Sequence, residues 1–132
     1  MTIPHEEHLR LCAIVDRRLE ARPPVLQVQR APFLQRTYGW AVVETRTIRV
    51  YWNPFWPRVW TQVTHLHELV HLSGKAGCAG HGTRFKRALL RAAEAAWGVD
   101  LGDHTDLAQM DYRDLESWLC RRLMLRTFLL ET

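Results

Sequence analysis

The stretch HLHELVHLSGKAGCAGHG, residues 65–82, holds four histidines and one glutamate. Its residues 67–71 read HELVH, which has the form H-E-x-x-H. Residues four apart on an α-helix lie one turn above each other on the same face, so His67 and His71 can bind one metal ion together. Glu68 is one step round the helix, where it can reach a water on that ion without being a ligand. This spacing predicts a metal site on a helix.

A third protein ligand is needed, because a catalytic zinc usually has three protein ligands and a water. The candidates are Cys78, His81 and His104. His81 has the best setting, since it follows a glycine-rich loop that can fold back beneath the helix and directly precedes the next helix. We therefore expect Zn²⁺ on His67, His71 and His81. His65 lies about 200° round the helix from His67, so we expect it to point away from the metal, as a packing or a surface histidine.

The apolar residues around the motif independently predict the helix. They recur at helical spacing from residue 58 to residue 73, and Gly74 is suited to end the helix. Thr83 is expected to cap the next helix. Further helices are expected at residues 4–20, 83–97 and 111–130, with irregular chain at 99–109. The tail LMLRTFLL, residues 123–130, is apolar nearly all round, so we expect it to be buried or to contact a partner.

A two-residue alternation of apolar and polar residues predicts strands at residues 25–29 and 47–52. Residues 38–44 are also strand-like, and the short junction at 45–46 predicts a hairpin with the following strand. We expect a three-stranded, mainly antiparallel sheet. The fold class is α+β, with an N-terminal helix before the sheet and the H-E-x-x-H helix and C-terminal helices after it.

Size and composition predict one globular domain, residues 1–132. Hydrophobic residues make up 47% and charged residues 24% of the chain. No apolar run approaches the roughly 20 residues that span a bilayer, and the N-terminus lacks the apolar block of a signal peptide. The three cysteines form no C-x-x-C pair, which excludes a zinc ribbon and favours small buried thiols. We expect a cytoplasmic, intracellular protein with no membrane partner.

The predicted site suggests hydrolysis. Zinc lowers the pKa of bound water to about 7 and polarises a carbonyl oxygen. Glu68 would take the proton of that water and pass it to the leaving amine. The pattern therefore predicts a zinc metalloendopeptidase that hydrolyses peptide bonds in a protein or peptide substrate.

The order of elements and motifs resembles the SprT-like zinc metalloproteases, the family that includes Spartan. The matching residues are Gly39-Trp40, residues 48–53, HELVH at 67–71 and HGTRF at 81–85. The resemblance covers roughly residues 1–98. It implies a minimal zincin-like domain with zinc on His67, His71 and His81 and with Glu68 as catalytic base. It also implies action on DNA-associated proteins, as in the repair of DNA–protein crosslinks, and a location at the nucleoid.

The chain departs from that family after the protease core. Many members carry a zinc ribbon there, whereas residues 98–132 are a predicted helical extension without cysteines for one. The metzincin pattern also matches through Gly74, and then fails because residue 77 is glycine and not histidine. A ribonuclease family with a similar start needs a histidine at the same place. ArdC-like antirestriction proteins have a similar HELVH segment, and that relation stays open.

A net charge of +4 favours an anionic partner. Cations with exposed aromatic rings suit single-stranded DNA, through phosphate contacts and base stacking. The candidate nucleic-acid contacts are Arg84, Lys86, Arg87, Arg91, Trp52 and Trp56. Three further cations, Arg46, Arg49 and Arg58, flank the hairpin and the aromatic run at residues 51–60. A solvated basic face with core tryptophans is the structural alternative.

Two hypotheses follow, and a third is weaker. The first is a zinc metallopeptidase acting on DNA-associated proteins. The second is a zinc-containing nucleic-acid-binding or antirestriction module with little or no peptidase activity. A metal-dependent nuclease is the third. Glu68 favours the enzyme, because a purely structural zinc site has no need of that carboxylate.

Overall fold

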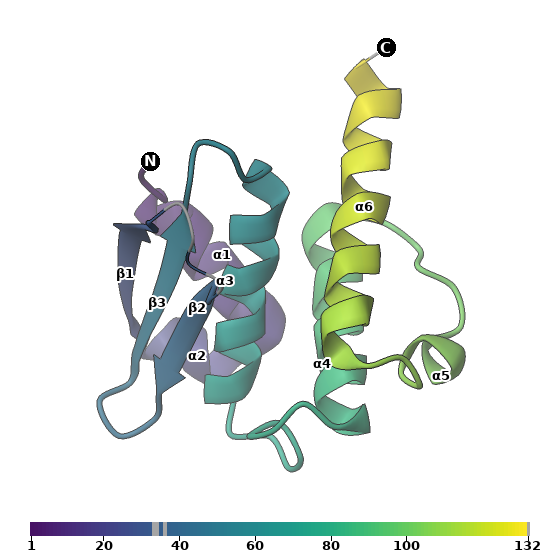
Figure 1. Cartoon of the computed structure of the whole chain (residues 1–132). Coiled ribbons are helices and arrows are strands. Elements are labelled where there is room, and N and C mark those ends of the chain that lie inside the picture. The colour runs from purple at the N-terminus through teal and green to yellow at the C-terminus, as the bar shows by residue number, and fades with distance from the viewer. Residues whose placement is uncertain (33–34, 36, 132) are drawn as a thin grey trace.

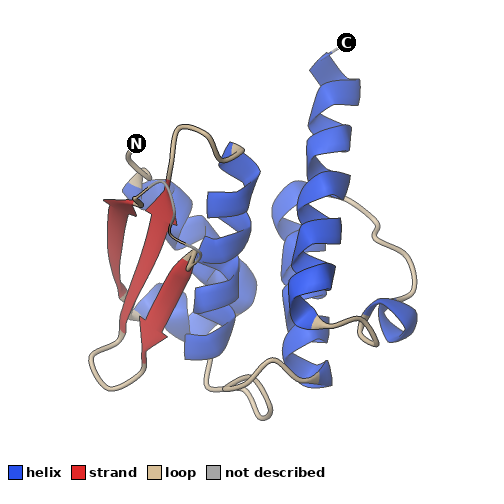
Figure 2. Cartoon of the chain, viewed as in Figure 1, coloured by secondary structure: helices blue, strands red, loops and turns tan. Residues whose placement is uncertain are grey.

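The structure is a computed structural model that describes the whole chain except residues 33–34, 36 and 132 and the side chains of residues 127–131. Its elements run in the order α1 (His5–Val15), α2 (Arg17–Ala21), β1 (Val25–Arg30), β2 (Gly39–Val42), β3 (Thr47–Trp52), α3 (Arg58–Leu72), α4 (Thr83–Trp97), α5 (His104–Leu107) and α6 (Tyr112–Glu131). Figure 1 shows α3 between the sheet on one side and α4 and α6 on the other. The α+β class is confirmed, and Figure 2 shows its helices and strands.

The sheet is mixed, so the expectation of a mainly antiparallel sheet is wrong. The strand order is β1-β3-β2; β1 pairs with β3 in parallel, and β2 pairs with β3 antiparallel as the predicted hairpin. An alternating pattern shows which side chains face the core, but it does not show which strands are neighbours. The strand with fully buried Ile48 and Val50 lies at the centre, where both of its edges are paired.

Helix α3 packs on one face of the sheet. Ile48 and Val50 are buried, whereas Arg49 between them points to the opposite face and stays partly exposed. The close approach of β2 to α3 depends on Gly39, because a Cβ there would lie 2.6 Å from the Thr64 methyl and 2.8 Å from the Arg49 carbonyl oxygen. This packing brings the edge strand beside the helix that carries the histidines.

The first predicted helix is two helices in the structure. Asp16 has extended backbone angles (φ −164°, ψ 133°), and its side chain accepts a hydrogen bond from the backbone N–H of Arg18 at the start of α2. An aspartate can cap a new helix, and here that local bond interrupts the apolar spacing. The expected Thr83 cap is also wrong, since Gly82 holds the capping position without a side-chain bond. The segment 99–109, expected to be irregular, includes the short helix α5.

The C-terminal helix α6 closes the helical side of the core. Leu115, Leu119 and Leu123 are each at most 1% exposed and belong to the same hydrophobic cluster as residues of α1, α3 and α4. In the predicted apolar tail, Met124 and Leu125 are exposed, and the side chains from residue 127 onward lie outside the described ones. None of the helices that the structure describes is long and apolar enough to cross a bilayer.

Candidate metal centre

Three histidines meet at one point of the molecule. The Nε2 atoms of His67, His71 and His81 lie 3.0 Å from one another in all three pairings. These residues form a cluster that could hold a metal ion. The sequence analysis predicted the same set, including the choice of His81 as third member.

Each histidine comes from an element whose geometry the sequence explains. His67 and His71 lie one helical turn apart on α3. Gly74 follows α3 and has a φ of 71°, a left-handed conformation that reverses the chain. L-residues rarely adopt this conformation, which explains the glycine at this position. The loop then returns to α3, and His81 lies just before the first residue of α4.

The hydrogen bonds on the other side of the rings fix two of the tautomers. The Nδ1 of His71 faces the carbonyl oxygen of Cys78 at 2.8 Å, and the Nδ1 of His67 contacts the Glu116 carboxylate. Both partners only accept, so both Nδ1 atoms carry a proton. In the neutral rings, the Nε2 atoms of His67 and His71 then each carry a lone pair, and these two lone pairs are directed at each other.

A cation between the rings would satisfy this arrangement. Burial lowers the pKa of His67, but the hydrogen bond and charge of Glu116, together with the charge of Glu68, raise it by more. A proton on one Nε2 atom would satisfy one of the three contacts. A metal ion held by the Nε2 atoms of His67, His71 and His81 would satisfy all three contacts at once. Burial lowers the pKa of His71 to about 4, which keeps that ring neutral as a ligand must be.

Glu68 lies at the same centre but is not part of the histidine triangle. Its side chain is 6% exposed, and its Oε1 is 3.9 Å from the Nε2 of His67. Burial raises the pKa of Glu68 to about 7, against the lowering effect of His67. The carboxylate is therefore placed to exchange a proton with a group bound beside the histidines.

A cleft of about 900 Å³ opens onto the histidines and Glu68. Gly39 and Ala41 of the edge strand β2 line one side, and Tyr112 and Glu116 of α6 line another. Among the described residues, β2 has a strand neighbour only at β3. The candidate metal centre thus borders a groove with the outer edge of β2 along it.

Two residues of this centre were missed by the sequence analysis. Glu116 contacts His67, and the ring of Tyr112 stacks on His81 with centroids 3.8 Å apart and planes 13° apart. Both come from α6, where they lie one turn apart. Their four-residue spacing is the only sequence signal, and many surface helices share it.

The other two candidate ligands lie in different environments. The Cys78 side chain is buried in the hydrophobic cluster, so its contribution to the centre is the backbone carbonyl. His104 pairs with Glu94 at 2.6 Å. The three cysteines are free and buried, as expected from their spacing.

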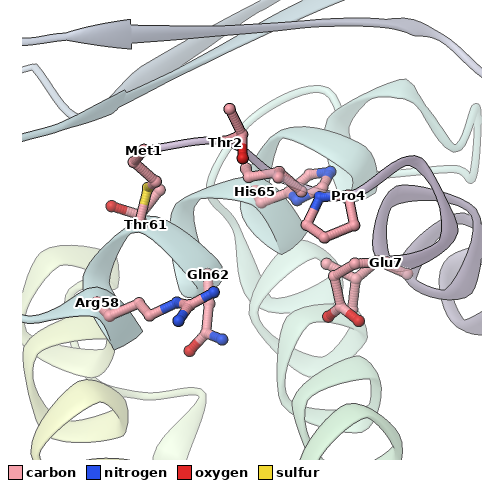
Figure 3. A pocket seen from close by; sticks show the side chains of 10 residues that line it. Met1, Thr2, Pro4, Glu7, Arg58, Thr61, Gln62 and His65 are labelled. Carbon is pink, nitrogen blue, oxygen red and sulfur yellow. The ribbon is translucent and has the colours of Figure 1, made fainter.

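His65 points away from the triangle, as predicted, and is a buried packing histidine that pairs with His8. Its Nε2 lies 2.8 Å from the Nδ1 of His8, whose Nε2 lies 2.9 Å from the carbonyl oxygen of Pro24. Burial lowers the pKa of His65 to about 3. Figure 3 shows this residue at a pocket beneath the N-terminus, together with Pro4 and Thr61. That pocket is only about 30 Å³ and has room for water alone.

The predicted nucleic-acid contacts do not form one surface. Lys86 donates to the Met110 carbonyl oxygen and Arg87 to the Thr105 hydroxyl, so both bind the chain before α6. Arg84 and Arg91 are exposed on α4, on the far side of α3 from the sheet (Figure 1).

The two predicted tryptophans are partly buried and engaged within the chain. Trp56 packs edge-on against Tyr38 with ring centroids 4.9 Å apart. The guanidinium carbon of Arg30 lies over the Trp52 ring, 5.7 Å from the ring centre.

Known proteins give no further guide to this centre. In comparisons with protein-family models, curated proteins and solved structures, the chain has no match.

Proposed function

We propose that this protein is a zinc-dependent metallopeptidase. The observation that carries the proposal is the convergence of three histidine Nε2 atoms next to the buried Glu68 carboxylate at the floor of a cleft. Three imidazole ligands with a free side toward a cleft are typical of catalytic zinc, whereas structural zinc is closed by four protein ligands. Zinc bound there would polarise a carbonyl oxygen and make water more acidic.

The roles of the protein groups follow from their positions. A peptide in the cleft can lie extended beside β2, which has a free edge. Glu68 accepts a proton from the attacking water as the water oxygen bonds to the carbonyl carbon. The carbon–nitrogen bond then breaks, and Glu68 returns the proton to the amine.

Action on DNA-associated proteins in the cytoplasm or at the nucleoid is the narrower part of the proposal. It rests on the resemblance of HELVH and HGTRF to the SprT-like proteases and on the net charge of +4. The test is a gel assay of wild type and Glu68→Gln with a basic DNA-binding protein, with and without single-stranded DNA. We expect cleavage by the wild type, loss of at least about 100-fold in the variant with zinc retained, and stimulation by DNA.

The outcomes separate the two parts. Equal cleavage by Glu68→Gln would refute the mechanism. Cleavage at the same rate with and without DNA would support the peptidase and contradict the proposal that its substrates are DNA-associated proteins. No cleavage by zinc-loaded wild type would favour the second candidate function.

That second candidate is a zinc-containing nucleic-acid-binding module. It is favoured by the sheet face turned away from α3, where the Arg49 guanidinium lies 4.8 Å from the centre of the Trp40 ring. The Oε1 atom of Gln27 accepts hydrogen bonds from Nη2 (2.7 Å) and Nε (2.9 Å) of the same guanidinium. A cation stacked on an aromatic ring is a common contact surface for single strands.

Binding of a labelled single strand in a salt series tests this surface. Arg49→Ala should weaken binding and reduce the salt slope by about 1, whereas Arg17→Ala at an exposed position of α2 serves as the control of equal charge. Absence of binding by wild type at low salt would eliminate this candidate.

A further inference from the structure

The C-terminal helix contributes to the metal centre from outside the H-E-x-x-H motif. Glu116 of α6 accepts a hydrogen bond from the Nδ1 of His67, on the ring edge opposite the Nε2 that meets the other histidines. Two buried leucines, Leu115 and Leu119, fix α6 against the core on either side of Glu116. The carboxylate is thus held in place by packing and does not depend on a mobile surface side chain.

We propose that Glu116 is a positioning residue of the metal centre, and that zinc affinity depends on its contact with His67. The inference rests on the zinc site of the proposed function and deepens it. Metal-binding histidines commonly donate their second ring N–H to a carboxylate, which fixes the tautomer and makes the ring a better ligand. The Cys78 carbonyl plays the same part for His71.

Two alternative roles for Glu116 fit the geometry less well. It is not in position to be a ligand, because it faces Nδ1 and the ion would lie at Nε2. It is also no ordinary surface ion pair, since the side chains of His67 and Glu116 are only 12% and 21% exposed. A carboxylate at this depth has little water to replace a lost partner, so the contact is tightly linked to the orientation of the ring.

Tyr112 provides a second contact from the same helix. Its ring covers one face of His81, the most exposed ligand candidate, and thereby restricts the rotation of that imidazole. Residues 98–132 are therefore part of the centre and not an appendage to it. By thermodynamic reciprocity, zinc must also stabilise α6 against the core by as much as α6 strengthens zinc binding.

Chelator competition measures the zinc affinity of wild type and three variants. Glu116→Ala removes the contact, Glu116→Gln keeps an oxygen that can accept from Nδ1, and Asp114→Ala removes the same charge at an exposed position of α6. We expect an affinity loss of about 10- to 100-fold for Glu116→Ala, a smaller loss for Glu116→Gln, and none for Asp114→Ala. The visible spectrum of the Co²⁺ form should change only in the Glu116 variants.

Urea unfolding of the metal-free variants shows whether each of them still folds. If Glu116→Ala does not fold, zinc affinity is compared between wild type and Glu116→Gln, whose side chain has nearly the same shape as that of glutamate. Zinc affinity in Glu116→Ala equal to wild type, or equal losses in Asp114→Ala, would overturn the positioning role. If wild type binds zinc and cleaves while Glu116→Ala binds as tightly, only this inference fails. If wild type binds no zinc, the inference and the proposed function fail together.

Discussion

His65 and His67 are separated by a single residue on α3, but their hydrogen-bond surroundings differ. His65 is 1% exposed and completes a closed hydrogen-bond chain with His8 and the Pro24 carbonyl oxygen. Because that oxygen only accepts, the Nε2 of His8 is protonated, its Nδ1 accepts, and the Nε2 of His65 donates. Every contact in this pair is satisfied by two neutral rings.

The centre at His67 has no such solution. Both fixed Nδ1 protons point away from the triangle, toward Glu116 and the Cys78 carbonyl, and leave lone pairs facing each other. The hydrogen-bond partners of the imidazole ring, and not its burial, therefore distinguish a packing histidine from a candidate metal ligand. Sequence spacing gives the same separation, since His65 and His67 lie about 200° apart on the helix.

Replacing one member of each group gives the largest expected contrast. His71→Ala should lower zinc affinity by on the order of 100- to 1,000-fold, since one of three protein ligands is lost. His65→Ala should leave zinc affinity within about twofold but reduce the free energy of unfolding by about 2–3 kcal/mol, because it opens a cavity and leaves the His8 acceptor unpaired. Zinc competition and urea unfolding check both. Equal loss of zinc in the two variants would contradict the distinction.

Removing the metal should destabilise only a chain with an intact triangle. At free zinc of about 1,000 times the dissociation constant, zinc should add about 4 kcal/mol to the free energy of unfolding of wild type. The same zinc should add only about 0.4–1.4 kcal/mol to His71→Ala, whose affinity is 100- to 1,000-fold lower, and nearly the full amount to His65→Ala. Thermal unfolding with zinc and with a chelator provides the measurement, and a zinc-independent wild type would mean that the triangle holds no metal.

Acid should act on the packing pair through His8. Burial lowers the pKa of His8 below its ordinary value of 6.5, against the raising effect of the Pro24 hydrogen bond. The groups facing it are His65, the Pro24 carbonyl oxygen, the Cys12 thiol at 3.9 Å and the His5 ring. Below about pH 6.5 the unfolded chain takes up a proton here that the folded chain does not, so stability falls as pH falls.

His8→Gln removes this titration. Urea unfolding between pH 7.5 and 5.5 in chelator should show a shallower loss of stability in the variant, by up to about 1.4 kcal/mol per pH unit. Chelator in every sample removes metal binding from the comparison, and the histidines that do not contact His8 contribute to both proteins alike. Parallel pH curves for the two proteins would show that His8 titrates normally in the fold.

The sequence predicted the histidine triangle because its signals are local. Two of the histidines are four residues apart on one helix, and the third follows a glycine-rich loop too short to carry it far from that helix. Helical periodicity likewise placed α3 and α4 within a residue of their observed ends. Such features depend on neighbours in the chain, which the sequence lists directly.

The remaining features needed the tertiary structure, because they depend on contacts between distant segments. The parallel pairing of β1 with β3, the contact of Glu116 with His67 and the stacking of Tyr112 on His81 join residues 22 to 49 positions apart. No local pattern distinguishes Glu116 from a glutamate on the exposed face of a helix. The sequence by itself determined which helix carries His67 and His71; only the packing of α6 through its buried leucines decided which carboxylate contacts His67.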